Sequence, residues 1–382
     1  MTTLSTRDVD VVIKICRRCQ PSGLERLPTR RWRDMVSIIS VAKAAGVSNK
    51  TVSRVINGEP YVTEETRERV EKAIRDLGYI PNMAARLIRS SRSNTFGIIT
   101  DYVSTTPYSV DIVRGIQDWA NANGKTILMA NTGASSKREA EIWKMFQSHR
   151  IDGVLYVTMY RRTVDPEAGD VRIPTVMINC RPQTQELLPS IEPDDYQGAQ
   201  DLTRYLLDRG HRKIGYIRLN PILLGAQLRL DAFRKTAADF GLAETDLSVR
   251  LGMEGPVGAE KNYVFAVATE MLQQKDRPTA IMSGNDEMTI QIYIAAMALG
   301  LRIPEDVSIV GFDDFRTVSL ALKPELTTAA LPYYDLGLEG AELLNSVVAG
   351  NKARPSSRVV PCKLVERTSV QSVSLIPSGR NA

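Results

Sequence analysis

Short apolar runs that alternate with helical patterns are the feature that most constrains the fold of this chain. Strand-length runs such as "FGIIT", "TILMAN", "DGVLYV" and "PTVMIN" flank amphipathic segments at 110–122 and 137–149, and the alternation resumes with "KIGYI", "TAIMSGND" and "VSIVGFDD". Near-continuous apolar strands between helices predict a parallel sheet covered on both faces. About 270 residues of this pattern is more than one sheet usually holds, so we predict an α/β core with two lobes.

Composition narrows the class of protein. The chain has 382 residues, of which 43% are hydrophobic and 24% are charged, as is usual for globular proteins. No apolar run approaches the roughly 20 residues that span a bilayer. The patch "VDVVIKIC" near the start lacks a small-residue cleavage site for secretion. We therefore expect a cytoplasmic protein.

Reactive and metal-binding patterns are weak. Four cysteines are too few for a disulfide framework in a chain of this size, and the CxxC of Cys16 and Cys19 has no second pair. The sequence has no P-loop, GxSxG or HExxH motif. His149 and His211 each precede a predicted strand, where a structural role is more common than a general base. We expect no catalytic residue, no metal and no cofactor, and thus no enzyme.

Charge is unevenly distributed along the chain. Residues 1–95 carry 18 Lys and Arg against 10 Asp and Glu, whereas the whole chain carries 49 against 44. A basic block on a mildly acidic body indicates a polyanion partner for the N-terminal part, although a solvated surface would give a similar count.

Three closely spaced helices are predicted in the patterned part of this basic block. The first, at 39–45, stops at Gly46, which tolerates the left-handed backbone of a helix end. Ser48 is placed to cap the second helix, which runs to Asn57, and Thr63 is placed to cap the third, at 64–77. The third helix carries an apolar stripe that includes Leu77. These helices predict a compact bundle.

The second helix has an unusual polar face. Asn49, Lys50, Ser53, Arg54 and Asn57 lie on one side, opposite an arc formed by aliphatic residues. Asn and Ser are mediocre helix formers, so solubility alone would favour other residues. Asn pairs with adenine edges and Lys or Arg with guanine, while hydroxyls reach phosphates. We interpret this face as a DNA-reading surface; the alternative is an ordinary surface helix.

Polar residues also follow several predicted strands. They are Asp101, Asn179, Asn285, Asp286, Asp313 and Asp314. In open α/β sheets ligands bind at the carboxyl ends of the strands, so these residues predict a small-molecule site between the lobes. Each one taken singly could instead be a helix cap or a turn residue.

The chain resembles the LacI/GalR family of bacterial transcription regulators. The resemblance rests on "AGVS", "TVSRV", "TRERV" and "LGYIPN" in the N-terminal part and on "NTFGIIT", "GHRKIGYI", "GNDEM", "LRIPEDVSIVGFDD" and "LTTAALP" in the body. It covers residues 35 to about 372 and implies a helix-turn-helix headpiece on a core like that of periplasmic sugar-binding proteins.

The resemblance also implies a division of the chain. We expect a basic extension at 1–34, either disordered or a mis-assigned start, a headpiece at 35–80, and a hinge helix with linker at 81–94. The core would span 95–372, with an N-lobe at about 95–191 and 328–350 and a C-lobe at about 192–327 and 351–372. A flexible tail would follow at 373–382, and because it lacks apolar heptads we expect no coiled-coil tetramer.

Site residues follow from the match to the family's motifs. The positions that match base-reading residues are Asn49, Lys50 and Arg54, and in "PNMAARLIR" Ile88 matches the residue that wedges into the minor groove. The full set of predicted DNA contacts is Ser48, Asn49, Lys50, Thr51, Ser53, Arg54, Asn57, Ala85, Arg86, Ile88 and Arg89. The predicted effector contacts are Asp101, Tyr108, Ser109, Asn179, Arg229, Asn285 and Asp313.

The function that the resemblance implies is a homodimeric, sequence-specific regulator of transcription. It would bind near-palindromic operator DNA, most commonly as a repressor of carbohydrate-metabolism genes, and a sugar-like effector between the lobes would switch its affinity. "TTPYS", Asn179 and "ILLGAQ" depart from the family's usual pocket pattern, so the ligand itself is not carried over. The alternative is a periplasmic-type solute-binding protein, which would leave the headpiece unexplained.

Overall fold

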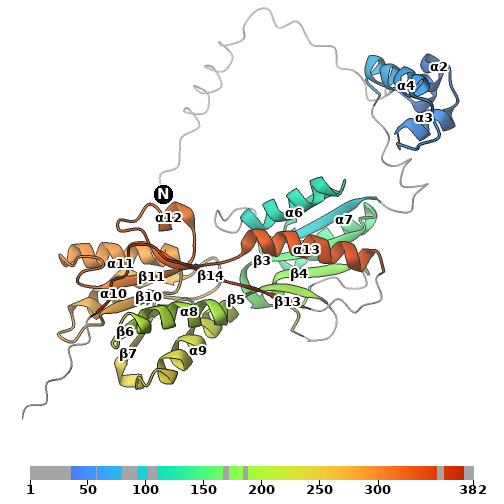
Figure 1. Ribbon diagram of the computed structural model, residues 1–382. Coiled ribbons are helices and arrows are strands. Elements are labelled where there is room, and N and C mark those ends of the chain that lie inside the picture. The colour runs from blue at the N-terminus through green and yellow to red at the C-terminus, as the bar shows by residue number, and fades with distance from the viewer. Residues whose placement is uncertain are drawn as a thin grey trace, which may run out of the picture. The chain divides into compact units, whose positions relative to one another are not determined.

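The computed structural model describes residues 36–56, 58–79, 93–101, 110–166, 172–183, 188–350 and 357–373 (Figure 1). The chain divides into two compact units, Met1–Arg89 and Ser90–Ala382. The predicted basic extension and hinge helix, and all but the first residue of the predicted tail, lie outside the described residues. None of the described helices has both the length and the apolarity that a membrane crossing requires.

The first unit contains the three predicted helices. They are α2 (Ile38–Ala45), α3 (Asn49–Ile56) and α4 (Glu64–Leu77). Gly46 ends α2 with a φ of 64°, as its sequence position predicted. Val41, Val52 and Val70, one from each helix, are fully buried together in the small core of this bundle. The helix–turn–helix arrangement is therefore confirmed.

Ser48 and Thr63 occupy the cap positions of α3 and α4, but only Ser48 makes a capping hydrogen bond. The backbone N–H of Thr51 donates to Ser48 Oγ at 3.1 Å, so Ser48 caps α3 as predicted. Thr63 is the N-cap residue of α4 as predicted, but its hydroxyl donates to Thr66 Oγ1 at 2.9 Å and makes no capping bond to the backbone of the helix. Leu77, at the end of the predicted apolar stripe, is 36% exposed because the helix ends there, at Gly78.

A six-stranded parallel sheet forms the first lobe of the second unit. Its order is β13 (Arg358–Pro361), β5 (Ser190–Asp194), β4 (Thr175–Arg181), β3 (Gly153–Thr163), β1 (Thr95–Thr100) and β2 (Thr126–Asn131). Helices α6 (Val110–Ala122) and α13 (Tyr333–Val348) pack on one face, and α7 (Ser136–Ser148) packs on the other (Figure 1). Burial on both faces explains the near-continuous apolar strands.

A second six-stranded sheet forms the other lobe. Its order is β14 (Lys363–Val365), β12 (Thr327–Ala330), β11 (Ser308–Asp313), β10 (Ala280–Ser283), β6 (Ile214–Arg218) and β7 (Leu247–Leu251), and only β14 is antiparallel to its neighbour. One face carries α8 (Asp195–Asp208) and α9 (Leu224–Asp239), and the other carries α10 (Val264–Gln273) and α11 (Asp286–Ala298). The remaining elements are the 3₁₀ turn η4 (Glu244–Asp246), the hairpin β8 (Met253–Glu254) and β9 (Lys261–Asn262), and α12 (Arg316–Ser319).

The chain crosses between the two sheets three times. It passes from β5 to α8, from β12 to α13, and from β13 to β14. The prediction that placed 351–372 wholly in the second lobe is wrong, because β13 pairs in parallel with β5, with Arg358 opposite Ile191. Residues 328–330 likewise belong to β12 of the second sheet rather than to the first lobe. The two-lobed parallel architecture itself is confirmed.

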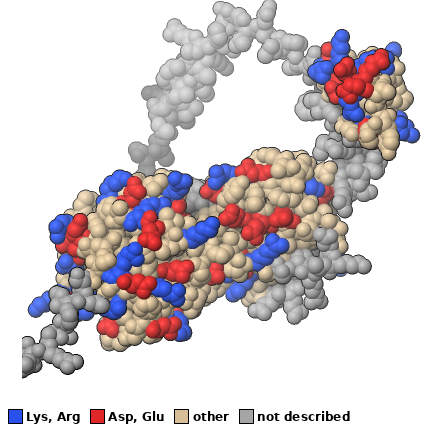
Figure 2. Space-filling model, viewed as in Figure 1, with Lys and Arg blue, Asp and Glu red and all other residues tan. Residues whose placement is uncertain are grey.

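Charges on the visible face of the second unit are mixed in sign (Figure 2). In the first unit, residues 36–79 hold seven Lys and Arg against six Asp and Glu, so this bundle is close to neutral. Within it, however, α3 carries Lys50 and Arg54 and no acidic residue. The described bundle therefore has little excess positive charge, but α3 itself is positively charged.

Candidate DNA-reading helix and effector cleft

Helix α3 presents the predicted polar face to solvent. Val52 and Val55 are buried, Asn49 and Lys50 are exposed, and Arg54 has 38% of its side chain exposed. Since the apolar side is used to pack the bundle, the polar side is available for a partner. Ser48, Thr51 and Ser53 lie on the same short helix or at its cap, whereas Asn57 lies outside the described residues.

Arg54 has one ionic neighbour within the bundle. Its Nε lies 3.5 Å from Glu59 Oε2, and both side chains are about two-fifths exposed. Exposed ion pairs contribute about 0–1 kcal/mol, so this contact holds the guanidinium weakly and leaves it able to reach another anion.

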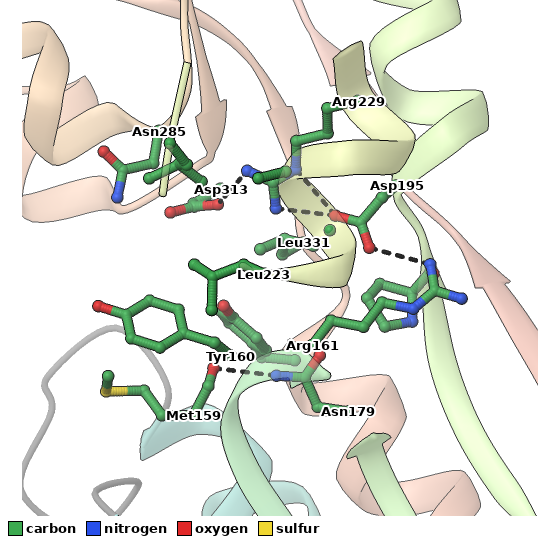
Figure 3. Close-up of a pocket in the computed structure, with 15 residues that line it drawn as sticks. Met159, Tyr160, Arg161, Asn179, Asp195, Leu223, Arg229, Asn285, Asp313 and Leu331 are labelled. Atoms are coloured by element: carbon green, nitrogen blue, oxygen red, sulfur yellow. Dashed lines mark hydrogen bonds and ion pairs between the residues drawn. The ribbon is translucent and has the colours of Figure 1, made fainter. Parts of the chain in front are cut away.

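The second candidate site is a cleft between the two sheets of the second unit. Its inner compartment is lined from β3 and β4 of the first lobe and from α8, α9 and the ends of β10 and β11 of the second (Figure 3). It has a volume of about 30 Å³, room for roughly two water molecules, because side chains fill most of it. Of the predicted effector residues, Asn179, Arg229, Asn285 and Asp313 line it.

A buried chain of ionic contacts fills the inner compartment. Arg229 Nε donates to Asp195 Oδ1 at 2.8 Å, and Arg161 Nη1 donates to Asp195 Oδ2 at 3.0 Å, so one carboxylate joins guanidinium groups from both lobes (Figure 3). Arg161 Nε also donates to Glu192 Oε2 at 2.9 Å. Arg229 Nη1 donates to Gly284 O at 2.7 Å and lies 3.6 Å from Asp313 Oδ1.

Asp313 has a strained backbone and a perturbed acidity. Its φ of 121° lies in a region that side chains other than glycine rarely adopt. Burial raises the pKa of Asp313 to about 7, with Arg229 opposing the rise and Asp195 and Glu287 adding to it. Such strain next to a pocket is typical of functional positions. Near neutral pH this carboxyl group therefore exchanges a proton in response to nearby charge.

Asn179 lies in the cleft with both amide hydrogens engaged. Its Nδ2 donates to Thr158 O at 3.0 Å and to Met159 O at 2.9 Å. The register between β3 and β4 shifts between Val157 and Arg162, which marks a bulge at this point. Bulges next to binding sites redirect side chains. Asn179 thus holds the bulge that brings Tyr160 and Arg161 to the pocket, a role that the sequence did not indicate.

Asp101 supports the same bulge from the next strand. Its Oδ1 accepts a hydrogen bond from the Met159 N–H at 3.0 Å, and its Oδ2 lies 3.0 Å from Arg162 Nη2. The side chain is buried and does not line the inner compartment. The other two predicted effector residues, Tyr108 and Ser109, lie outside the described residues, as do Ala85, Arg86, Ile88 and Arg89 of the predicted DNA contacts.

Two charged pocket residues, Arg161 and Asp195, were not predicted from the sequence. Asp195 directly follows the strand end "SIEPD", so the rule that selected the other strand-end residues would have selected it too. Arg161 was missed because β3 continues to Thr163, beyond the apolar run that predicted the strand. For Asp195 the strand itself was not among the predicted apolar runs, and for Arg161 the length of a predicted strand was underestimated.

The remaining candidate residues have structural surroundings. His211 is buried, with Nδ1 2.8 Å from Thr279 Oγ1 and Nε2 3.1 Å from Gln371 O. His149 is the C-cap residue of α7. Cys180 and Cys362 are buried free thiols. Within the described ranges, no three His, Cys, Asp or Glu side chains gather as a metal site.

The cleft continues into an outer compartment of about 70 Å³. Tyr160 reaches it from the first lobe, and the rest of its lining comes from the second lobe: Leu219, Asn220, Leu223, Met253, Glu260, Asn262, Asn285, Glu287 and Met288. Tyr160, Leu219, Leu223 and Asn285 line both compartments, so the two are continuous.

Comparison with known proteins identifies the family. Residues 37–82 match the family described as bacterial regulatory proteins, lacI family, and residues 203–370 match a periplasmic binding protein-like domain. The HTH-type transcriptional repressor PurR of Edwardsiella ictaluri is 31% identical over 338 residues, which cover 88% of this chain and 97% of that protein. The chain belongs to the LacI family of bacterial regulatory proteins.

Three further proteins are similar to between 73% and 88% of this chain. Catabolite control protein A of Priestia megaterium is 30% identical over 85% of this chain and 96% of its own length. The lac repressor dimer bound to operator and the anti-inducer ONPF is 26% identical, with a TM-score of 0.74 over 88% of this chain and all of that one. A LacI-family transcriptional regulator from Rhizobium etli is 85% identical over 73% of this chain and all of its own, with a TM-score of 0.72.

The family determines the class of function. This LacI-family chain is an effector-regulated transcriptional repressor, with a helix-turn-helix domain for DNA and a periplasmic-binding-protein-like core for the effector. Its relatives are transcriptional regulators rather than enzymes. The solute-binding alternative is disfavoured, because it has no use for the headpiece at 37–82.

Proposed function

We propose that this chain is a cytoplasmic, homodimeric repressor of carbohydrate-metabolism genes that reads a near-palindromic operator with α3. The observation that carries the proposal is the face of α3: hydrogen-bonding and cationic side chains point away from the buried valines, and the helix holds no acidic residue. Two-fold symmetry of a dimer would match two half-sites. Asn49, Lys50 and Arg54 would contact base edges, with Ser48, Thr51, Ser53 and Asn57 nearer the phosphates.

Arg54→Ala tests the reading of bases. One good guanidinium–guanine pair contributes about 1–3 kcal/mol of discrimination, so operator affinity should fall by about 10- to 100-fold while affinity for random DNA falls much less. Fluorescence anisotropy with both DNAs at several salt concentrations measures the two affinities. An equal loss on operator and random DNA would contradict the base-reading role.

Glu59→Gln is the matched control for that experiment. The change frees Arg54 from its ionic neighbour without altering α3, so binding to both DNAs should strengthen slightly at low salt and the preference for operator should persist. If Glu59→Gln abolished selectivity, Glu59 rather than Arg54 would be the determinant.

The effector site of the proposal is the cleft. Arg229, Asn285 and Asp313 of the second lobe and Arg161 of the first all reach its inner compartment, so occupancy would bias the arrangement of the lobes. One relative has been solved as a transcriptional regulator CelR–cellobiose complex, with 26% identity and a TM-score of 0.59. A gel shift with the protein's own upstream DNA, with and without candidate sugars, tests the proposal; no shift at any salt concentration would refute it.

A further inference from the structure

The guanidinium groups of the cleft are already engaged by carboxylates. Arg161 contacts Glu192 and Asp195, and Arg229 contacts Asp195 and lies near Asp313. Backbone carbonyl oxygens of Pro193 and Gly284 accept further hydrogen bonds from these two side chains. An anionic ligand would have to displace buried acidic partners to reach either arginine, which costs the desolvation of those carboxylates.

The outer compartment is acidic and has no cationic counterpart. Glu260 and Glu287 line it, and among its described lining residues there is neither Lys nor Arg. Its walls include the apolar side chains of Leu219, Leu223 and Met288, while Glu260 is half-buried and Glu287 is exposed. Glu287 belongs to the first turn of α11, where the positive end of the helix dipole stabilises a carboxylate.

Two further groups at the junction of the compartments indicate a bound molecule. Asn285 is only 6% exposed, its Oδ1 accepts from the Met288 N–H at 2.8 Å, and within the described residues its Nδ2 has no acceptor. Tyr160 lies below Asn285 and beside Leu223 in Figure 3 and is the side chain from the first lobe that lines both compartments. An aromatic face at an acidic pocket suits a cation.

We propose that the effector is a polyhydroxylated organic cation, such as an amino sugar, whose ammonium group lies between Glu260, Glu287 and Tyr160 while its hydroxyl groups meet Asn285 and Asp313. The inference rests on the proposed role of the cleft as the effector site. We expect neutral sugars to bind more weakly than such a cation, and we expect sugar phosphates and sugar acids not to bind. Contact with Tyr160 would make the first lobe sense the ligand.

The electrostatics of the buried acids agree with this charge. Burial, with smaller contributions from Asp195 and Glu287 and against the opposing charge of Arg229, raises the pKa of Asp313 to about 7. Burial also raises the pKa of Asp286 well above its ordinary value, and Asp313 adds to that shift. These raised pKa values show that the surroundings disfavour additional negative charge, whereas a cation beside Asp313 would favour its ionised form.

The test uses the full-length protein and matched sets of ligands. Each set holds a hexose, its 2-amino analogue, the neutral N-acetyl form of that amine, the uronic acid and the 6-phosphate. We expect the best amine to bind at least tenfold more tightly than its parent hexose in calorimetric titration. Rising NaCl concentration should weaken the binding of the amine and leave that of the hexose unchanged.

Two variants connect the preference to the compartment. Glu260→Gln/Glu287→Gln should lower the affinity for the amine by tenfold or more and change that for the hexose by less than twofold. Glu270→Gln removes one negative charge, where the double variant removes two, at an exposed position of α10 that does not line the cleft, so it should behave as the unmodified protein. Thermal melting of each variant without ligand checks that the fold is retained.

The outcomes separate this inference from the proposed function. Tighter binding of a hexose, acid or phosphate than of its amine overturns the charge assignment, and so does an amine series without binding. An amine preference that persists in the double variant overturns the assignment to Glu260 and Glu287. Operator gel shifts without ligand, run in parallel, report on the proposed function itself, because a protein that binds no operator at any salt concentration refutes that function whichever sugar binds.

Discussion

At the scale of single residues, Asn179 has the most specific role. Its φ of 58° is one that Asn and Asp tolerate, and its two amide hydrogens go to two carbonyl oxygens of the β3 bulge. Asp has the same shape and no donor. The hydrogen bonds to the neighbouring backbone therefore explain the choice of amide over acid.

Asn179→Asp isolates those hydrogen bonds. We expect the free energy of unfolding of the second unit to fall by about 2–3 kcal/mol, because two buried acceptors lose their donors and face a carboxyl group instead. Denaturant unfolding measures the change. Asn123→Asp is the control, since Asn123 Nδ2 donates to Trp119 O at an exposed helix end and should lose less than about 0.5 kcal/mol. Equal stability of the Asn179 variant and the unmodified protein would contradict the role.

Residue-scale prediction from the sequence succeeded where a local pattern was sufficient. The strand-end rule selected six residues. Asn179, Asn285 and Asp313 line the cleft, whereas Asp101, Asp286 and Asp314 do not. The rule did not predict which side chains contact each other. Arg161 and Asp195 are 34 residues apart and lie in different lobes, so their contact depends on the tertiary fold. Likewise, nothing local showed that the amide of Asn179 faces backbone carbonyls.

At the scale of elements, helices α6 and α13 are packed backbone against backbone. A methyl group on Gly337 would lie 2.1 Å from Ile112 O, and one on Gly115 would lie 2.1 Å from Tyr334 O. Both glycines are buried in their helices despite the entropic cost of glycine there. The close approach of these two helices is the physical reason for that choice.

Gly337→Ala should therefore destabilise the second unit. We expect a loss of about 3 kcal/mol, since the two helices have to move apart to admit one methyl group. Glu342→Ala changes an exposed position of the same helix and should stay within about 0.5 kcal/mol. Thermal or denaturant unfolding gives both values, and a Gly337 variant as stable as the Glu342 variant would contradict the close packing.

The sequence predicted elements well where each had its own apolar run. Strands β1, β2, β4, β6, β10 and β11 all fall on runs that were singled out. Strand β13 was missed because it is a short edge strand with Val359 54% exposed, so its four residues show no continuous apolar pattern. Edge strands are specified mainly by their pairing partner, which a local pattern does not reveal.

At the scale of the whole molecule, His211 joins distant parts of the second lobe. Its ring lies between Thr279, just before β10, and Gln371 near the C-terminal end of the described chain. Nε2 donates to the carbonyl oxygen of Gln371, and Nδ1 lies 2.8 Å from the Thr279 hydroxyl, which also donates to Lys213 O at 3.2 Å. Burial, joined by the charges of Arg209 and Arg212 and opposed by the hydrogen bond to Gln371, lowers the pKa of His211 to about 4.

This depressed pKa predicts a loss of stability in acid. Between pH 6.5 and pH 4 the unfolded chain binds a proton at His211 that the folded chain does not bind. The free energy of unfolding therefore decreases by up to about 3 kcal/mol as the pH is lowered through this range. His211→Gln should flatten this part of the pH profile, and His149→Gln at the end of α7 should leave it unchanged. Chemical denaturation at half-unit pH steps measures the slope, and a His211 variant that keeps the full slope would rule out His211 as its source.

The three crossings between the sheets have an evolutionary consequence. Each lobe is assembled from separate stretches of chain, and β13 and β14 are divided only by Cys362 although they belong to different sheets. A single recombination event near residue 89 can exchange the first unit, and with it the operator, as one block. No single event can exchange one lobe. Descendants of this gene can therefore acquire a new operator specificity by gene fusion. They can change the effector they respond to only by point mutation within the cleft or by replacing both lobes together.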